Sequence, residues 1–85
     1  MREFAFAIKD LSGVHARPAG LLVKEAIKYK SDITIEYNGK QADAKRIFAV
    51  MGLGAKCGDI LNIRINGEDE KIASENFSVF LNNNL

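Results

Sequence analysis

The amino-acid sequence predicts an α+β fold in which helices pack on one face of a single β-sheet. Three observations support this prediction. Some segments alternate apolar and polar residues, which is typical of half-buried strands. Other segments repeat apolar residues at steps of three and four, which is typical of amphipathic helices. The two kinds follow one another in the order β-α-β-β-α-β-α without long linkers, and this order favours a two-layer sandwich.

The first part of the chain is predicted to form a strand, a turn and a helix. Residues 3–9 alternate apolar side chains with polar or small ones, so they favour a half-buried strand. Residues 10–13 (Asp-Leu-Ser-Gly) have the composition of a turn. From Ala16 to Tyr29 apolar residues recur at helical spacing, and this segment predicts an amphipathic helix. Pro18 must lie in its first turn, because a proline further inside would break the helical hydrogen bonds.

A hairpin is predicted to follow this helix. Residues 32–37 alternate apolar and polar side chains and predict a second strand. The dipeptide Asn38-Gly39 comes next and strongly favours a two-residue hairpin turn. Residues 40–43 are therefore expected to return as a short third strand.

The second half of the chain is predicted to form a helix, a strand and a helix. Residues 47–51 form a compact apolar segment, which we interpret as a short helix although a buried strand has the same pattern. Residues 60–65 alternate in part and predict a fourth strand. A last helix follows the acidic residues 68–70, since negative charge stabilises a helix N-terminus. Its end, residues 82–84, is expected to fray.

The apolar side of each predicted element gives the candidate core. The strands contribute Phe4, Phe6, Ile33, Ile35, Ile63 and Ile65. The helices contribute Leu22, Val23, Ala26, Phe77 and Leu81. On the last helix, Ile72, Ala73 and Phe80 are expected on the same face as Phe77 and Leu81.

Length and composition restrict the function. A chain of 85 residues is expected to form one domain, residues 1–85, because it has no room for a second core. With one Cys and one His, the chain cannot form an internal disulfide, and a metal site built from His and Cys is nearly excluded. The longest near-apolar run, residues 47–55, is shorter than the about 20 residues of a membrane span, so no membrane insertion is expected. The net charge of +1 does not indicate nucleic-acid binding, and we expect a cytoplasmic protein.

The only histidine marks the candidate site. His15 directly precedes the predicted helix, whose first turn offers unpaired N–H groups and the positive end of the helix dipole to an anion such as phosphate. Ala16, Arg17 and Pro18 are therefore the candidate phosphate-binding residues. Arg17 adds a guanidinium suited to phosphate oxygens, whereas Pro18 has no N–H to donate. A neutral His15 imidazole is a nucleophile, and its attack on a phosphoryl group would form a phosphohistidine.

The residues alone leave a simpler interpretation of His15 open. A lone histidine beside a helix start can be a capping residue or a solvent-exposed side chain without any chemical role. The tetrapeptide His-Ala-Arg-Pro is also a short pattern, which occurs by chance in unrelated proteins.

Several motifs in collinear order resemble those of a known family. The segment from Gly13 to Ala19 matches the family's active-site signature. Further matches occur at Asn38-Gly39-Lys40, Ala44-Lys45, Val50-Met51, Leu53-Gly54 and Asn66-Gly67-Glu68-Asp69-Glu70. On these motifs, which span essentially the whole chain without insertions, the sequence resembles the HPr family. These proteins are the histidine-containing phosphocarriers of the bacterial sugar phosphotransferase system.

The resemblance implies both a fold and an activity. The implied fold is an open-faced β-sandwich of four antiparallel strands covered on one face by three helices. HPr-like proteins take a phosphoryl group from phosphorylated enzyme I and pass it to EIIA domains of sugar permeases. His15 would be phosphorylated on Nδ1, and Arg17 would assist the transfer. The chain would then be a phosphoryl carrier and not an independent enzyme, with no cofactor and no metal.

Two further expectations concern partners. A carrier exposes its site to successive proteins, so we expect a monomer. The alternative to a carrier is an HPr-like regulatory adaptor, in which phosphorylation of His15 controls the binding of other proteins. The two functions can coexist.

The resemblance also implies a docking surface and a change in regulation. In HPr-like proteins the short helix presents apolar side chains next to the histidine. The candidate docking residues are Gly20, Leu21, Lys24, Ile47, Phe48 and Met51, although for apolar residues in general core packing is the better interpretation of Ile47, Phe48 and Met51. Gram-positive members carry a serine, the target of a dedicated kinase, at the position of Arg46. Arginine cannot be phosphorylated in that way, so this regulatory branch is expected to be missing or altered.

Overall fold

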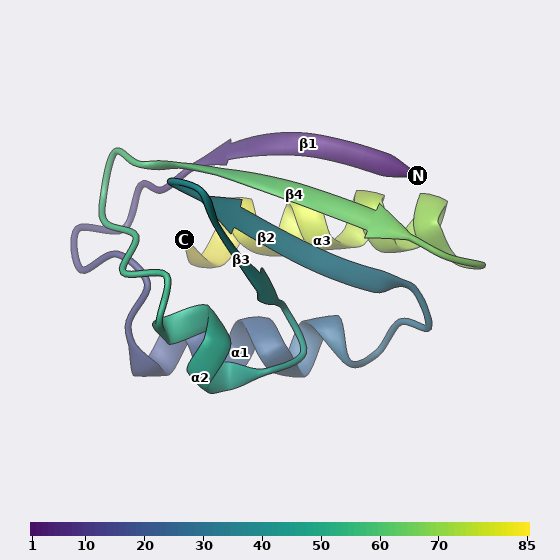
Figure 1. The fold of residues 1–85 in the computed structure, drawn as a ribbon, viewed down its shortest axis with the longest axis horizontal. Helices are drawn as coiled ribbons and strands as arrows, with labels where there is room; N and C mark the ends of the chain where they lie inside the picture. The colour runs from purple at the N-terminus through teal and green to yellow at the C-terminus, as the bar shows by residue number, and fades with distance from the viewer.

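The computed structural model describes residues 1–85 and contains the predicted elements in the predicted order (Figure 1). The strands are β1 (Arg2–Ala7), β2 (Asp32–Tyr37), β3 (Lys40–Asp43) and β4 (Ile60–Asn66). The helices are α1 (Ala16–Ala26), α2 (Ile47–Met51) and α3 (Glu70–Asn84). The α+β prediction and the assignment of residues 47–51 to a helix are confirmed.

All four strands form one antiparallel sheet in the order β1-β4-β2-β3. Because side chains alternate across a strand, the register determines which residues share a face. Ile63 of β4 lies between Phe4 of β1 and Ile35 of β2, and Ile35 is next to Ala42 of β3. This apolar row faces the helices, and the opposite face of the sheet has no helix over it (Figure 1). The architecture is an open-faced α+β sandwich.

The core lies between the sheet and the helices. Nine of the eleven predicted core residues are buried, whereas Phe4 and Val23 are only partly buried and pack against the core from its edge. Ile72 was expected on the inner face of α3 but is 55% exposed, because the buried row runs through Ala73, Phe77 and Leu81 at four-residue steps and Ile72 lies to one side of it. Residues from connecting segments complete the core, among them Ile8, Val14, Leu53 and Ala55.

The turn between β2 and β3 has the predicted hairpin geometry. Asn38 has a φ of 51° and Gly39 a φ of 79°, as a type I′ turn requires at both central positions. The dipeptide therefore sets the register in which Tyr37 pairs with Lys40.

The ends of two helices differ from the predictions. Helix α1 ends at Ala26 and not at Tyr29, because the N–H groups of Lys28 and Tyr29 bond three residues back and tighten the last turn. The predicted fraying of residues 82–84 is wrong. They are helical, and the following Leu85 is 3% exposed and bonded to the segment after β1. No helix in the structure combines the length and the apolar character that crossing a membrane requires.

Candidate functional site

His15 is the N-cap residue of α1 and is exposed to solvent. Its backbone is extended, with φ −118° and ψ −174°, and its side chain bonds to no N–H group of the helix. His15 therefore occupies the N-cap position without a side-chain capping bond, and its exposure agrees with the alternative of a solvent-exposed side chain. Its carbonyl oxygen accepts the N–H of Ala19 at 2.9 Å, which starts the helical hydrogen bonds. The imidazole is left free to react.

The first turn of α1 presents the predicted donors. The N–H groups of Ala16 and Arg17 have no main-chain acceptor, as expected of the first residues of a helix. Pro18 is buried, and its missing N–H costs nothing at this position. Arg17 is exposed and forms no ion pair, so its guanidinium is free to meet an anion beside His15.

A hollow of about 220 Å³ adjoins His15. From α1 and the preceding loop it is lined by Asp10, His15, Arg17, Pro18 and Leu21. From the end of α3 it is lined by Asn83 and Asn84. The structure thus brings His15, Arg17, Pro18 and Leu21 together, as the sequence indicated. It adds Asp10, Asn83 and Asn84, which no sequence motif identified, because only the tertiary arrangement places the end of α3 beside the start of α1.

The loop before His15 is held by a close approach to the segment between α2 and β4. Gly13 has a φ of +67°, and an added Cβ would lie 2.7 Å from the carbonyl oxygen of Ala55. Only glycine fits both conditions. The N–H of Val14 donates to that same oxygen at 3.1 Å, and the N–H of Ser12 donates to the carboxylate of Asp10 at 2.8 Å. The sequence Asp-Leu-Ser-Gly therefore forms the tight turn that its composition predicted.

Asp59 fixes the segment between α2 and β4, against which Gly13 packs. Its carboxylate accepts the hydroxyl of Tyr37 at 2.7 Å and the N–H of Lys56 at 2.8 Å. The Tyr37 hydrogen bond, followed by the Lys56 N–H, lowers the pKa of Asp59 below its ordinary value. The same hydrogen bond raises the pKa of Tyr37. The segment on which Gly13 rests is thereby tied to the end of β2.

The candidate docking residues lie on two helices that contact one another, α1 and α2. An added Cβ on Gly20 would lie 3.7 Å from Cδ1 of Ile47, an ordinary van der Waals distance, so position 20 faces Ile47 and has room for an alanine. Phe48 is 84% exposed and Leu21 is 39% exposed, whereas Ile47 and Met51 are half-buried against the core. The core interpretation is thus wrong for Phe48 and correct in part for Ile47 and Met51.

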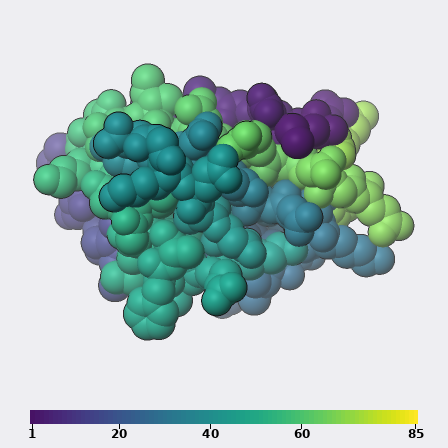
Figure 2. Space-filling model, viewed as in Figure 1, coloured from purple at the N-terminus to yellow at the C-terminus, as the bar shows by residue number.

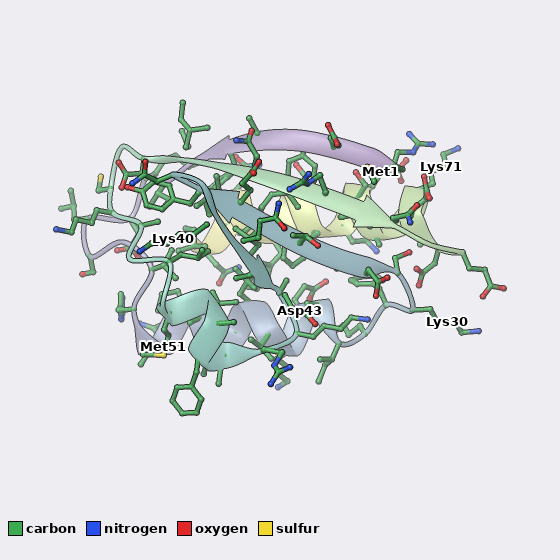
Figure 3. All side chains as sticks on the ribbon, viewed as in Figure 1. Met1, Lys30, Lys40, Asp43, Met51 and Lys71 are labelled. Atoms are coloured by element: carbon green, nitrogen blue, oxygen red, sulfur yellow. The ribbon has the colours of Figure 1, made fainter.

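The figures show how this surface is arranged. In the space-filling view the segment around α2 projects at one edge of the molecule (Figure 2). Met51 lies at the end of α2 that is beside the start of α1 (Figure 3). Lys24 is exposed in the last turn of α1, where it contributes positive charge. The exposed apolar groups are therefore next to the helix that begins at His15.

Arg46 is the N-cap residue of α2 and is exposed, and its side chain makes no capping hydrogen bond. It lines a second hollow of about 500 Å³ together with Ile47 and Phe48 of α2 and residues 41–43 of β3. The neighbouring Lys45 has a partner, because its Nζ donates to the carbonyl oxygen of Tyr29 at 2.8 Å. Arg46 is therefore the freer of these two cations.

No group of three or more His, Cys, Asp or Glu side chains converges in the structure. The single Cys57 is exposed, and its Sγ lies 3.6 Å from the carbonyl oxygen of Lys9.

Comparisons with known proteins agree with this geometry. A family model described as the PTS HPr component phosphorylation site matches residues 2–83, which include His15. The phosphocarrier protein HPr of Buchnera aphidicola (subsp. Acyrthosiphon pisum, strain APS) is 45% identical over 69 residues, 81% of either chain. A crystal structure of HPr-C-His from Thermoanaerobacter tengcongensis has a TM-score of 0.93 at 34% identity, covering 99% of this chain and 94% of that one. An HPr dimer from the same organism has a TM-score of 0.77 at 35% identity, covering 98% and 95%.

Proposed function

The chain belongs to the HPr family of phosphocarrier proteins, and on that premise we propose that His15 accepts a phosphoryl group from phosphorylated enzyme I and passes it to EIIA domains of sugar permeases. The observation that carries the proposal is the state of His15. It is exposed, bonded to nothing through its side chain, and followed by two unpaired N–H groups and a free guanidinium. This is a nucleophile placed at an anion-binding helix end.

The transfer uses the neutral imidazole. The lone pair of Nδ1 attacks phosphorus, and the bond from phosphorus to the donor breaks with its electron pair remaining on the donor. The phosphoryl oxygens then lie close to the N–H groups of Ala16 and Arg17 and to the Arg17 guanidinium, which stabilise their charge. Because His15 is exposed to solvent, a second protein can approach the phosphohistidine and take the group by the reverse step.

We also propose which residues the partners contact. Phe48, Leu21 and the exposed parts of Ile47 and Met51 supply apolar area, and aromatic and Met side chains are enriched in interfaces. Gly20 faces Ile47 at the contact between α1 and α2 and so lies beside these groups. Lys24 and Arg46 add positive charge, which favours acidic partner surfaces and speeds association.

The proposal also covers the oligomeric state, location, binding partners and regulation of the protein. The protein acts as a monomer in the cytoplasm, binds no nucleic acid and does not insert into membranes. It carries out no catalysis without its partners. A kinase that modifies a serine at the start of α2 has no target in this chain, because Arg46 occupies that place.

The deciding experiment follows a label. The protein is incubated with enzyme I and phosphoenolpyruvate labelled in its phosphate, and an EIIA domain is then added. Acid-labile label on the wild type, absent from His15→Ala and chased onto EIIA, supports the carrier. Absence of label from the wild type contradicts it. Label that forms and cannot be chased favours the regulatory adaptor. Size-exclusion chromatography with light scattering measures the molar mass before and after phosphorylation and tests whether the protein is a monomer.

A further inference from the structure

The segment that carries His15 is anchored from two sides by main-chain hydrogen bonds. It comprises residues 8–15 and joins β1 to α1. On one side, the N–H of Val14 donates to Ala55, as described above. On the other side, the N–H groups of Lys9 and Asp10 both donate to the main-chain oxygen of Leu85, at 2.6 and 2.7 Å. The His15 side chain makes no capping hydrogen bond, so the position of His15 depends on these main-chain hydrogen bonds to Ala55 and Leu85.

Leu85 is itself fixed in two ways. Its side chain is 3% exposed and belongs to the core cluster. Its N–H donates to the carbonyl oxygen of Leu81 at 2.9 Å, so it continues the hydrogen bonding of α3. Carbonyl groups at a helix end lack donors within the helix. Here the N–H groups of Lys9 and Asp10 are the donors to the main-chain oxygen of Leu85. The loop thus caps α3, and α3 in turn fixes the loop.

Asp10 connects this contact to the turn before His15. Its carbonyl oxygen accepts the N–H of Gly13 at 3.0 Å, and its carboxylate accepts the N–H of Ser12. A displacement of Asp10 therefore moves the whole turn. The residues just before Leu85, Asn83 and Asn84, line the hollow opposite His15. The side chain of Asn84 is held in place by a 2.9 Å bond from its Nδ2 to Phe80 O. The position of Leu85 thus sets both walls of the hollow.

We propose that Leu85 is a positioning residue for His15: its buried side chain and main-chain oxygen fix Asp10 and, through it, the imidazole relative to Arg17. This inference rests on the proposed function. A displacement of about 1 Å at a reacting group can cost about a hundredfold in rate. The candidate docking residues on α2 make no contact with Leu85 through these bonds, so loosening it should reduce kcat and leave KM unchanged.

The test compares Leu85→Ala with the wild type at a temperature at which both are fully folded. Two donors are used: phosphorylated enzyme I, and phosphoramidate, whose P–N bond breaks with loss of ammonia as the His15 nitrogen bonds to phosphorus. We expect kcat with enzyme I and the rate with phosphoramidate to fall about tenfold. The KM of the protein in the enzyme I reaction should stay unchanged. Leu85→Met, which keeps a side chain of similar volume, should restore both rates.

Leu81→Ala is the matched control. Leu81 is 0% exposed, belongs to the same helix and core, and forms no main-chain hydrogen bond with residues 8–15. This variant should lose stability and keep the wild-type kcat. Wild-type rates in Leu85→Ala, or an equal loss of kcat in both variants, would overturn the proposal, since either result leaves Leu85 with a general core role.

A readout without phosphoryl transfer separates this inference from the proposed function. Hydrogen exchange of the Ser12 and Gly13 amides should become faster in Leu85→Ala and stay unchanged in Leu81→Ala. If the wild type accepts no phosphoryl group from enzyme I, the proposed function fails, whereas this comparison still tests Leu85. Unchanged exchange of these amides in Leu85→Ala contradicts the positioning role.

Discussion

The carboxylate of Asp69 accepts two hydrogen bonds from Ser31, one from the backbone N–H at 2.9 Å and one from the hydroxyl. Its second oxygen accepts the N–H of Lys30 at 2.9 Å. Ser31 is 1% exposed and lies at the end of the turn that follows α1, and Asp69 is the N-cap residue of α3. One side chain therefore joins the start of β2 to the start of α3, at the end of the molecule away from His15.

Asp69 should make stability depend on acid pH. The Ser31 hydroxyl, followed by the N–H of Lys30, lowers the pKa of Asp69 from 3.8 to about 2. Folding thus favours the ionised form. The stabilisation of the fold by the ionised Asp69 carboxylate is complete at pH values above its ordinary pKa of 3.8. It is lost as the pH falls through the lowered pKa of about 2. The difference in unfolding free energy between wild type and Asp69→Asn, measured in urea, should be large at pH 7 and shrink below pH 4. A difference that stays constant down to pH 2 would contradict this.

Gly13→Ala should destabilise the protein more than Gly39→Ala. Both glycines have a positive φ, which costs an alanine about 1–2 kcal/mol. At Gly39 an added Cβ meets nothing within 4 Å, whereas at Gly13 it would lie 2.7 Å from the carbonyl oxygen of Ala55. The loss at Gly13 should therefore exceed about 2 kcal/mol in urea unfolding, because backbone must move as well. Equal losses would show that the loop adjusts without cost.

Arg17→Ala should slow phosphoryl transfer without unfolding the protein. Arg17 is exposed and has no ion pair to lose, so the free energy of unfolding should change by less than about 0.5 kcal/mol. A hydrogen bond from a charged group contributes about 1.5–3 kcal/mol, which corresponds to a rate loss of about 10- to 150-fold. Arg17→Lys keeps the charge and loses the planar donors, so its transfer rate should lie between those of the wild type and Arg17→Ala. Stopped-flow transfer at wild-type rate in Arg17→Ala refutes the role.

Phe48→Ala should weaken partner binding and leave stability intact. Its side chain is 84% exposed, so little buried area is lost. An aromatic residue at the centre of an interface contributes about 2 kcal/mol or more, and KM for enzyme I or EIIA should rise at least about tenfold. Val79→Ala is the control, since Val79 is 60% exposed on α3. If both substitutions change KM equally, the docking surface is not at α2.

The elements, and the place of His15 beside a helix start, could be predicted from local sequence because their signals are local. The Asn38-Gly39 turn, the helix after His15 and the core face of each strand all follow from short-range patterns, and the structure confirms them. Local sequence predicted the end of α3 wrongly. Three asparagines indicate fraying, and the partners that hold Leu85 lie at Lys9 and Asp10, almost the whole chain away. Asn83 and Asn84 were missed at the site for the same reason.

The sheet order also affects how the chain folds during synthesis. β1 is made first, yet its only neighbour in the sheet is β4, with Arg2 opposite Ile65. Such distant pairings cost loop-closure entropy and slow folding. Until β4 has left the ribosome, β1 exposes both hydrogen-bonding edges and the apolar side chains of Phe4 and Phe6. The first strand made is therefore among the last to be paired, and the sheet is completed only when most of the chain is available.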